Sequence, residues 1–172
     1  MNIKLLKKDF EIKSINIETE EVFQHLKDFL IEDAHNYIKH KLCSIYWYYK
    51  DEKMLWYITI STSTLKIRDK HLELLSWKMD WLEWISFPVP GVLIWKFLVN
   101  KDNQWEWIWK DLLLYIMWYC YELSKTIWIR FIIIDSNPKA VSYYEKFWFV
   151  TIESKKKSSY MVFDLNLYDD LD

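Results

Sequence analysis

Glycine is almost missing from this chain of 172 residues. The sequence contains one glycine, Gly91, and 12 tryptophans, whereas average usage would place about 12 glycines in a chain of this length. Glycine is the residue that adopts positive φ angles and lets the backbone approach another group closely. A domain with many turns therefore needs glycines that this sequence does not show.

Other shortages exclude whole classes of protein. The two cysteines, Cys43 and Cys120, lie in apolar periodic stretches, which indicates reduced core residues and no disulfide framework. The four histidines form no metal-ligand motif, and the net charge of −2 provides no field that would recruit nucleic acid or a membrane. No apolar run is long enough for a membrane span or a signal peptide. These features lead us to expect a cytoplasmic protein.

The apolar pattern predicts a single α/β (α+β) domain over residues 1–172, with its core at about 9–165. Helical spacing predicts helices at residues 18–29, 31–39, 110–124 and 138–147. Alternating or continuous apolar runs predict strands at residues 10–15, 44–49, 54–61, 92–99, 129–134, 149–153 and 159–165. Residues 66–90 show no regular pattern, and the acidic end at 168–172 is expected to fray.

Several tryptophans stand where the backbone would be expected to require glycine. Trp128 and Trp148 each follow a predicted helix and precede a predicted strand. That is the C′ position, which is commonly left-handed and commonly glycine. Trp105, Trp107 and Trp109 lie between a buried strand and a helix N-terminus, where phosphate-binding loops are rich in glycine.

Two explanations of the tryptophans stay open. Genuine tryptophans could form one face of a strand or stack on single-stranded nucleic acid, in a non-catalytic, aromatic-rich binding module. Alternatively, the codon UGA, which means tryptophan in some genetic codes and glycine in others, is written as tryptophan where glycine is meant. The second explanation also accounts for the missing glycines, and we favour it. It predicts glycine at positions 56, 95, 105, 107, 109, 128 and 148, whereas Trp47 is the position where the two explanations are hardest to separate.

Three stretches carry a family pattern once glycine is read at these positions. Gln104-x-x-Trp107-x-Trp109 matches a loop of Gln or Arg, two residues, Gly, one residue, then Gly or Ala. Ala140 to Phe149 matches A-x-x-F-Y-x-x-x-G-F, with Tyr143 in the Phe position, and the strand end at residues 132–137 continues the match. In these motifs the chain resembles the GNAT superfamily of acetyl-CoA-dependent N-acetyltransferases.

The resemblance implies a GNAT fold, in which a central mixed, mostly antiparallel sheet is splayed between two parallel strands and flanked by about four helices. It also implies acetyl-CoA as the cosubstrate, with no metal. The pantetheine arm would pair with the backbone of the preceding strand at Phe97, Leu98 and Val99. Asn137, a predicted N-cap before Pro138, would lie beside the cofactor.

The loop would hold the pyrophosphate of coenzyme A. Backbone N–H groups must point at that charge, and the positive end of the following helix adds to the attraction. The residues that the resemblance assigns to this cradle are Gln104, Trp105, Glu106, Trp107, Ile108, Trp109 and Lys110, with Tyr143 also placed at the cofactor.

Tyr144 takes the place of the family's general acid. A phenol near the sulfur could protonate the leaving thiolate when an amine attacks the thioester. The sequence does not identify a general base. Asp80, Glu83 and Glu106 are candidates by position alone, and a water relay is an equal alternative. Three consecutive lysines at 155–157 are expected to be a solvated connection between strands.

The acceptor is a primary amine of a small molecule, peptide or protein in the first hypothesis. The alternative is a toxin-type acetyltransferase acting on aminoacyl-tRNA, because F-P-V-P-G-V-L-I-W-K-F-L-V, residues 87–99, resembles that branch too. The chain lacks the excess of basic residues that tRNA binding favours. A nucleic-acid partner, tRNA, is therefore expected only in that alternative. A homodimer is left open, and no membrane partner is expected.

Overall fold

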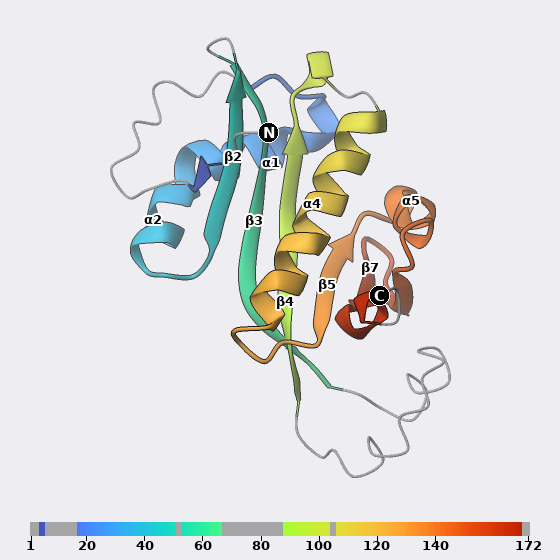
Figure 1. Cartoon of the computed structure of the whole chain (residues 1–172). Coiled ribbons are helices and arrows are strands. Elements are labelled where there is room, and N and C mark those ends of the chain that lie inside the picture. The colour runs from blue at the N-terminus through green and yellow to red at the C-terminus, as the bar shows by residue number, and fades with distance from the viewer. Residues whose placement is uncertain (1–3, 6–16, 51–52, 67–87, 104–105, 170–172) are drawn as a thin grey trace. The chain divides into compact units, whose positions relative to one another are not determined.

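The computed structural model of the chain describes residues 4–5, 17–50, 53–66, 88–103 and 106–169 (Figure 1). Contacts divide the chain into two compact units. The first unit comprises Met1–Ser61 and Ile94–Ile116, and the second comprises Thr62–Leu93 and Met117–Asp172. The expected strand at residues 10–15 lies outside the described residues, as do residues 67–87 of the stretch for which no pattern was found.

The first unit contains a helical run without a break. It consists of the 3-10 turn η2 (Glu21–Phe23), α1 (Gln24–Asp28), the π-helical segment η3 (Phe29–Asp33) and α2 (Ala34–Lys39). The sequence predicted two helices separated at Leu30, and this separation is wrong. The stretch F-L-I-E-D-A holds neither Pro nor Gly to end a helix, and the π-helical turn continues the run.

The first four strands follow the order β1-β2-β3-β4, and the residues of β3 and β4 are divided between the two units. They are β1 (Lys4–Leu5), β2 (Ser44–Lys50), β3 (Lys53–Leu65) and β4 (Val89–Val99). β1 and β3 both pair with β2 in antiparallel fashion, with Tyr46 opposite Leu5 on one side and Ile58 on the other. The buried core residues of this unit are Ile17, Leu26, Phe29, Leu30, Ala34, Ile45, Met54, Tyr57 and Leu98.

The second unit contains the carboxyl-terminal strands and the short helix α5. Its elements are β5 (Phe131–Ser136), the 3-10 turn η6 (Pro138–Ala140), α5 (Val141–Glu145), β6 (Val150–Ser154), β7 (Ser159–Asp164) and the 3-10 turn η7 (Leu165–Tyr168). The strand order continues as β4-β5-β7-β6, and β7 is antiparallel to both β5 and β6. The core includes Leu65, Val89, Phe131, Ile133, Ile152 and Val162.

Helix α4 (Glu106–Ser124) connects β4 to β5 along the chain. A helical crossover is the connection that parallel neighbouring strands require, and the four pairs whose register is described, β1–β2, β2–β3, β5–β7 and β6–β7, are antiparallel. The predicted α/β fold with a mixed sheet is therefore confirmed.

The carboxyl terminus is ordered further than the sequence suggested. The Tyr121 hydroxyl donates a hydrogen bond of 2.8 Å to the Asp169 carboxylate, and the rings of Tyr121 and Tyr168 stack 4.8 Å apart. Arg130 donates two hydrogen bonds of 2.8 and 2.9 Å to the buried Asp164 carboxylate, which also caps η7. The prediction of a frayed end was wrong for Tyr168 and Asp169, because these long-range contacts hold them.

The two predicted left-handed C′ positions have different outcomes. Trp148 has φ 66°, and Phe149 N donates to Tyr144 O while Trp148 N donates to Glu145 O. These are the two hydrogen bonds of the Schellman motif, so the prediction is confirmed there. Trp128 is not among the described residues with positive φ, and the prediction was wrong at that position.

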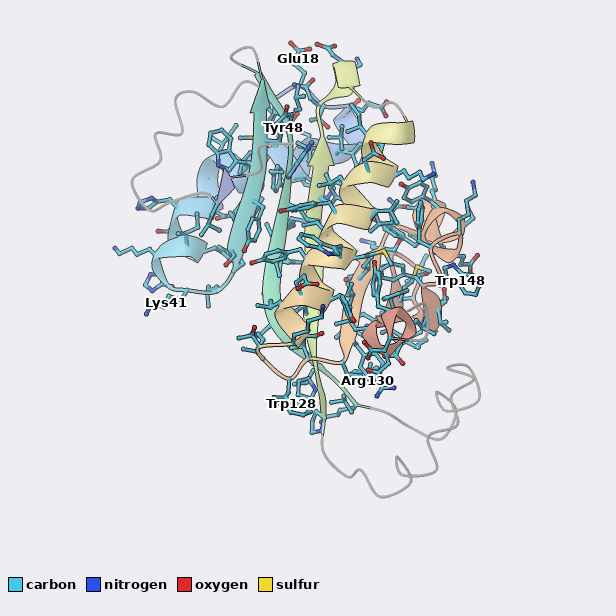
Figure 2. All side chains as sticks on the ribbon, in the orientation of Figure 1. Glu18, Lys41, Tyr48, Trp128, Arg130 and Trp148 are labelled. Atoms are coloured by element: carbon cyan, nitrogen blue, oxygen red, sulfur yellow. The ribbon has the colours of Figure 1, made fainter. Side chains whose placement is uncertain are left out.

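The turn at the end of α4 explains the difference at Trp128. The amide groups of Thr126 and Ile127 both donate to the carbonyl of Leu123, so the helix ends before Trp128 is reached. Figure 2 labels both tryptophans. Their side chains are 95% exposed at Trp128 and 76% exposed at Trp148.

We expect Trp148→Gly to raise the free energy of unfolding by about 1 kcal/mol, because a left-handed conformation strains any residue with a Cβ. Trp128→Gly is the matched control. It removes an equally exposed indole without relieving strain, so it should be neutral or destabilising by up to about 1 kcal/mol. Urea unfolding of both variants checks this, and a larger gain from Trp128→Gly would contradict it.

Candidate functional site

The end of β4 is fixed by packing of its side chains. Leu98 and Val99 are fully buried. The ring of Phe97 meets the ring of Trp109 edge-on, with a centroid distance of 4.3 Å. Because all three side chains are engaged in packing, any contact of this strand end with a cofactor would come from its backbone.

Asn100 holds the chain where it leaves β4. Its side-chain amide donates to Met54 O at 3.0 Å and accepts from Asp102 N at 3.2 Å, while its own N–H donates to Leu55 O at 2.8 Å. The residue is 1% exposed. The sequence analysis missed Asn100, although a polar residue directly after a continuous apolar strand was a usable signal.

Helix α4 begins four residues earlier than the sequence predicted, at Glu106 instead of Lys110. Glu106, Trp107, Ile108, Trp109 and Lys110 therefore belong to the first turns of the helix. The first N–H groups of a helix have no partner in a preceding turn, which makes this end suited to an anion. Ile108 is buried and Lys110 is exposed, while Gln104 and Trp105 lie outside the described residues.

Asn137 and Pro138 begin the short helical segment after β5 as predicted. The Asn137 side chain accepts a hydrogen bond from Lys139 N at 3.0 Å, and Pro138 occupies the first position of the turn. The N-cap prediction is confirmed, whereas a contact between Asn137 and a cofactor stays a prediction.

Tyr144 lies in an aromatic cluster at the end of α5. Its ring meets Tyr143 at 5.6 Å and Phe149 at 5.7 Å, and Phe147 lies 5.2 Å from Tyr143. The contact between Tyr144 and Phe149 is the hydrophobic pair that accompanies a Schellman motif. The backbone turn at Trp148 thus also orients the side chain of Tyr144.

Burial raises the pKa of Tyr144 above its ordinary value, and the neighbouring Tyr143 phenol raises that pKa further. The ordinary value is about 10, so the hydroxyl carries its proton throughout the neutral range. Such a group can donate a hydrogen bond or a proton, and it cannot serve as a base.

The cysteines are free thiols, with Cys120 buried and Cys43 half-buried. Burial raises the pKa of Cys43 to about 11 and that of Cys120 to about 12, so neither is a reactive thiolate near neutral pH. Of the proposed general bases, Asp80 and Glu83 lie outside the described residues. Within the described ranges, no three His, Cys, Asp or Glu side chains gather as metal ligands. No described helix has the length and apolar character for crossing a membrane.

No protein-family model matches the chain, and no curated protein matches it. Several solved structures are similar to it. The toxin AtaT complexed with acetyl-methionyl-tRNAfMet is 16% identical, with a TM-score of 0.78, over 99% of this chain and 98% of AtaT. A Tyr-to-Phe variant of KacT is 16% identical with a TM-score of 0.75, over 99% of this chain and 98% of KacT. AtaTR bound with acetyl-CoA is 16% identical with a TM-score of 0.75, over 99% of this chain and 96% of that one.

These similarities extend over the whole chain, so the chain has the fold of AtaT and KacT. The fold class predicted from the motifs therefore agrees with the structures. At 16% identity, activity and substrates do not follow from the fold.

The raised pKa of Tyr144 leads to a pH-dependent prediction. Between pH 10 and the folded-state pKa, the unfolded phenol loses its proton while the folded phenol keeps it, so the folded state binds more protons and stability falls with rising pH. Tyr144→Phe removes this contribution. The free energy of unfolding of the parent chain should therefore drop relative to that of Tyr144→Phe above pH 10, by at most about 1.4 kcal/mol per pH unit.

Urea unfolding of both proteins at pH 8 to 11, followed by circular dichroism, measures this difference. Tyr57, whose pKa is also raised by burial, contributes equally to both proteins and cancels. Parallel curves for the two proteins across this range would show that Tyr144 is not protected.

Proposed function

We propose that the chain is an acetyl-CoA-dependent N-acetyltransferase of the toxin type, and that its acceptor is the α-amino group of an aminoacyl-tRNA. The observation that carries the proposal is the fold shared over 99% of the chain with AtaT, whose structure holds acetyl-methionyl-tRNAfMet. A broader acceptor range, with amines of small molecules, peptides or proteins, has no such observation in its favour.

The chain's own residues fit acetyl-CoA in three respects. Asn100 ties the end of β4 to β3, which steadies the backbone proposed to pair with the pantetheine arm. Helix α4 begins at Glu106 and is 19 residues long, so its N-terminus can attract the pyrophosphate. Tyr144 keeps a proton that it can deliver.

Acetyl-CoA supplies the acetyl group as a thioester. In the proposed reaction the amine forms a C–N bond to the acetyl carbon and the C–S bond breaks. Tyr144 gives its proton to the leaving thiolate, and the ammonium proton of the acceptor passes to water or to a base not yet assigned. Tyr144 is protonated at neutral pH, as a proton donor must be, while burial raises its pKa and so makes it a weaker acid than an exposed phenol.

We also propose that glycine is meant at most of the seven tryptophan positions named above. Trp148 supports this by its φ of 66° and its exposure, and Trp128 by its exposure of 95%. At Trp95 the buried indole Nε1 finds no hydrogen-bond partner in the described part of the chain. Packing opposes the proposal at Trp56, which is 1% exposed and stacks on Tyr48 at 6.0 Å.

The gene and the mass of the natural protein test this directly. We expect UGA at most of the 12 tryptophan positions, with UGG rare. Intact-mass spectrometry of protein from its own cells should find a mass lower by one indole side chain for each such codon. A mass equal to that of the written sequence would exclude glycine and favour the aromatic-rich binding module.

The transfer reaction is tested with a protein that carries glycine at the seven positions. It should bind acetyl-CoA with micromolar affinity, the range of metabolite sites, whereas the tryptophan form should not, because indoles at 105, 107 and 109 would block the cradle. Acetyl transfer from labelled acetyl-CoA to a set of aminoacyl-tRNAs is then compared with transfer to polyamines and peptides. Binding of acetyl-CoA without transfer to any aminoacyl-tRNA would contradict the proposed acceptor.

Tyr144→Phe in the same protein should lower kcat by about 10²-fold or more, with little change in KM for acetyl-CoA. Tyr143→Phe is the matched control, because it removes one hydroxyl from the same aromatic cluster and leaves the Phe that the family pattern has at this position, and nearly full activity is expected. Equal losses would indicate damage to the aromatic cluster instead of a lost proton donor.

A further inference from the structure

The three consecutive lysines at residues 155–157 lie in the hairpin turn between β6 and β7. Lys155 N donates to Ser158 O at 2.7 Å and closes the turn, and all three lysine side chains are exposed. Tight hairpin turns favour Gly, Asn and Asp, which adopt the required backbone conformations most easily. Like charges at neighbouring positions also repel one another. The turn itself therefore gives no reason for three lysines.

The register of the strands places this turn at the carboxyl end of β5. Ser159, the first residue of β7, pairs with Ser136, the last residue of β5, and with Ser154, the last residue of β6. The Cα atoms of residues paired in this way lie about 5 Å apart. Lys139 follows three residues after Ser136, and α5, which carries Tyr144, comes next along the chain (Figure 1). The lysine turn and the segment that leads to Tyr144 therefore begin at the same end of these strands.

The positive charge at this end is largely uncompensated. Lys155 lies 4.0 Å from the Glu153 carboxylate, and both side chains are exposed, so this ion pair contributes little. In the described part of the chain, the ammonium groups of Lys139, Lys156 and Lys157 have no carboxylate partner. Exposed lysines that gather without matching carboxylates are typical of a surface that binds phosphate groups.

Two carboxylates limit this surface on the side of the sheet. Asp135 and Glu153 both pair with Tyr160 in the register of the strands. Burial raises the pKa of Tyr160 most, and both carboxylates raise that pKa further, which indicates that they lie near its phenol. A polyanion would thus be attracted at the turn and repelled one residue further inside the sheet. The charges suit a phosphate backbone that passes across the end of the strands.

We propose that Lys139, Lys155, Lys156 and Lys157 bind the phosphate backbone of the acceptor stem of the tRNA, beside the segment that carries Tyr144. The inference rests on the proposed function, because an aminoacyl group reacts only when the RNA that carries it is held in place. The net charge of −2 does not oppose it, since charges act over about 8 Å at physiological salt. The exposure expected of a solvated connection is also what phosphate contacts need.

RNA binding is tested without any transfer reaction. No tryptophan follows Trp148, so the lysine turn is the same whether or not glycine is meant elsewhere. Fluorescence anisotropy with uncharged tRNA, at several salt concentrations, compares Lys156→Gln, Lys157→Gln and the double variant with their parents, in the chain as written and in the seven-glycine protein. Each substitution should weaken binding and lower the slope of log Kd against log salt concentration by about 0.7–0.9. Circular dichroism establishes that every protein is folded.

Lys125→Gln is the matched control for the single variants. Lys125 is exposed, pairs with Glu122 at 2.8 Å and precedes the amino end of β5, the end opposite to the lysine turn. It removes the same charge from the same unit, so the affinity for tRNA and the salt slope should change little. Equal effects of Lys125→Gln and Lys156→Gln would show that only the total charge matters, and would overturn the surface.

Transfer assays distinguish the phosphates of tRNA from those of acetyl-CoA. In the seven-glycine protein, the double variant should raise KM for aminoacyl-tRNA several-fold and leave KM for acetyl-CoA unchanged. A raised KM for acetyl-CoA with an unchanged KM for aminoacyl-tRNA would assign the lysines to the cofactor and overturn the proposal.

The proposed function and the proposed surface can fail separately. Transfer to aminoacyl-tRNA, with the same Kd and salt slope in the parent and the double variant, overturns the surface and leaves the function intact. Binding of tRNA that weakens in the double variant, with no transfer to any aminoacyl-tRNA, supports the RNA surface and contradicts the proposed acceptor.

Discussion

The left-handed turn at residue 148 is the constraint on which the proposed catalytic group depends. Helix α5 is five residues long, too short to be stable by itself, so its geometry comes from the turn that ends it. There Tyr144 O accepts from Phe149 N at 3.3 Å, and the rings of the same two residues pack at 5.7 Å. One backbone conformation thereby sets both the position of Tyr144 and the burial that keeps its proton.

The tryptophans differ in what the surrounding structure does with them. Trp56 is enclosed by the core and Trp95 is half-buried with an unsatisfied nitrogen, whereas the indoles of Trp128 and Trp148 extend into solvent. An exposed indole gains little from burial that could offset the strain of a left-handed backbone. Glycine is therefore favoured most at position 148, where backbone and exposure agree, and least at position 56.

The fold follows from the apolar pattern of the strands and helices. An identity of 16% to AtaT suffices for the same fold when apolar residues keep the periods of their strands and helices. The proposed chemistry is less tolerant. It requires bare backbone at the start of α4 and a protonated phenol after β5.

The sequence by itself determined the order of the elements, strands β2 to β7, the N-cap at Asn137 and the turn at Trp148, because periodicity and capping act over a few residues. The predicted start of α4 was four residues too late, and the predicted break at Leu30 does not exist. The sequence also showed no sign of β1 or of the contacts that hold Asp169. Only the tertiary structure decided these points and brought Asn100 to Met54, 46 residues away. The rings of Phe29, Tyr37 and Trp95 likewise meet from three elements, and no short-range pattern encodes a contact that forms only when distant segments pack together.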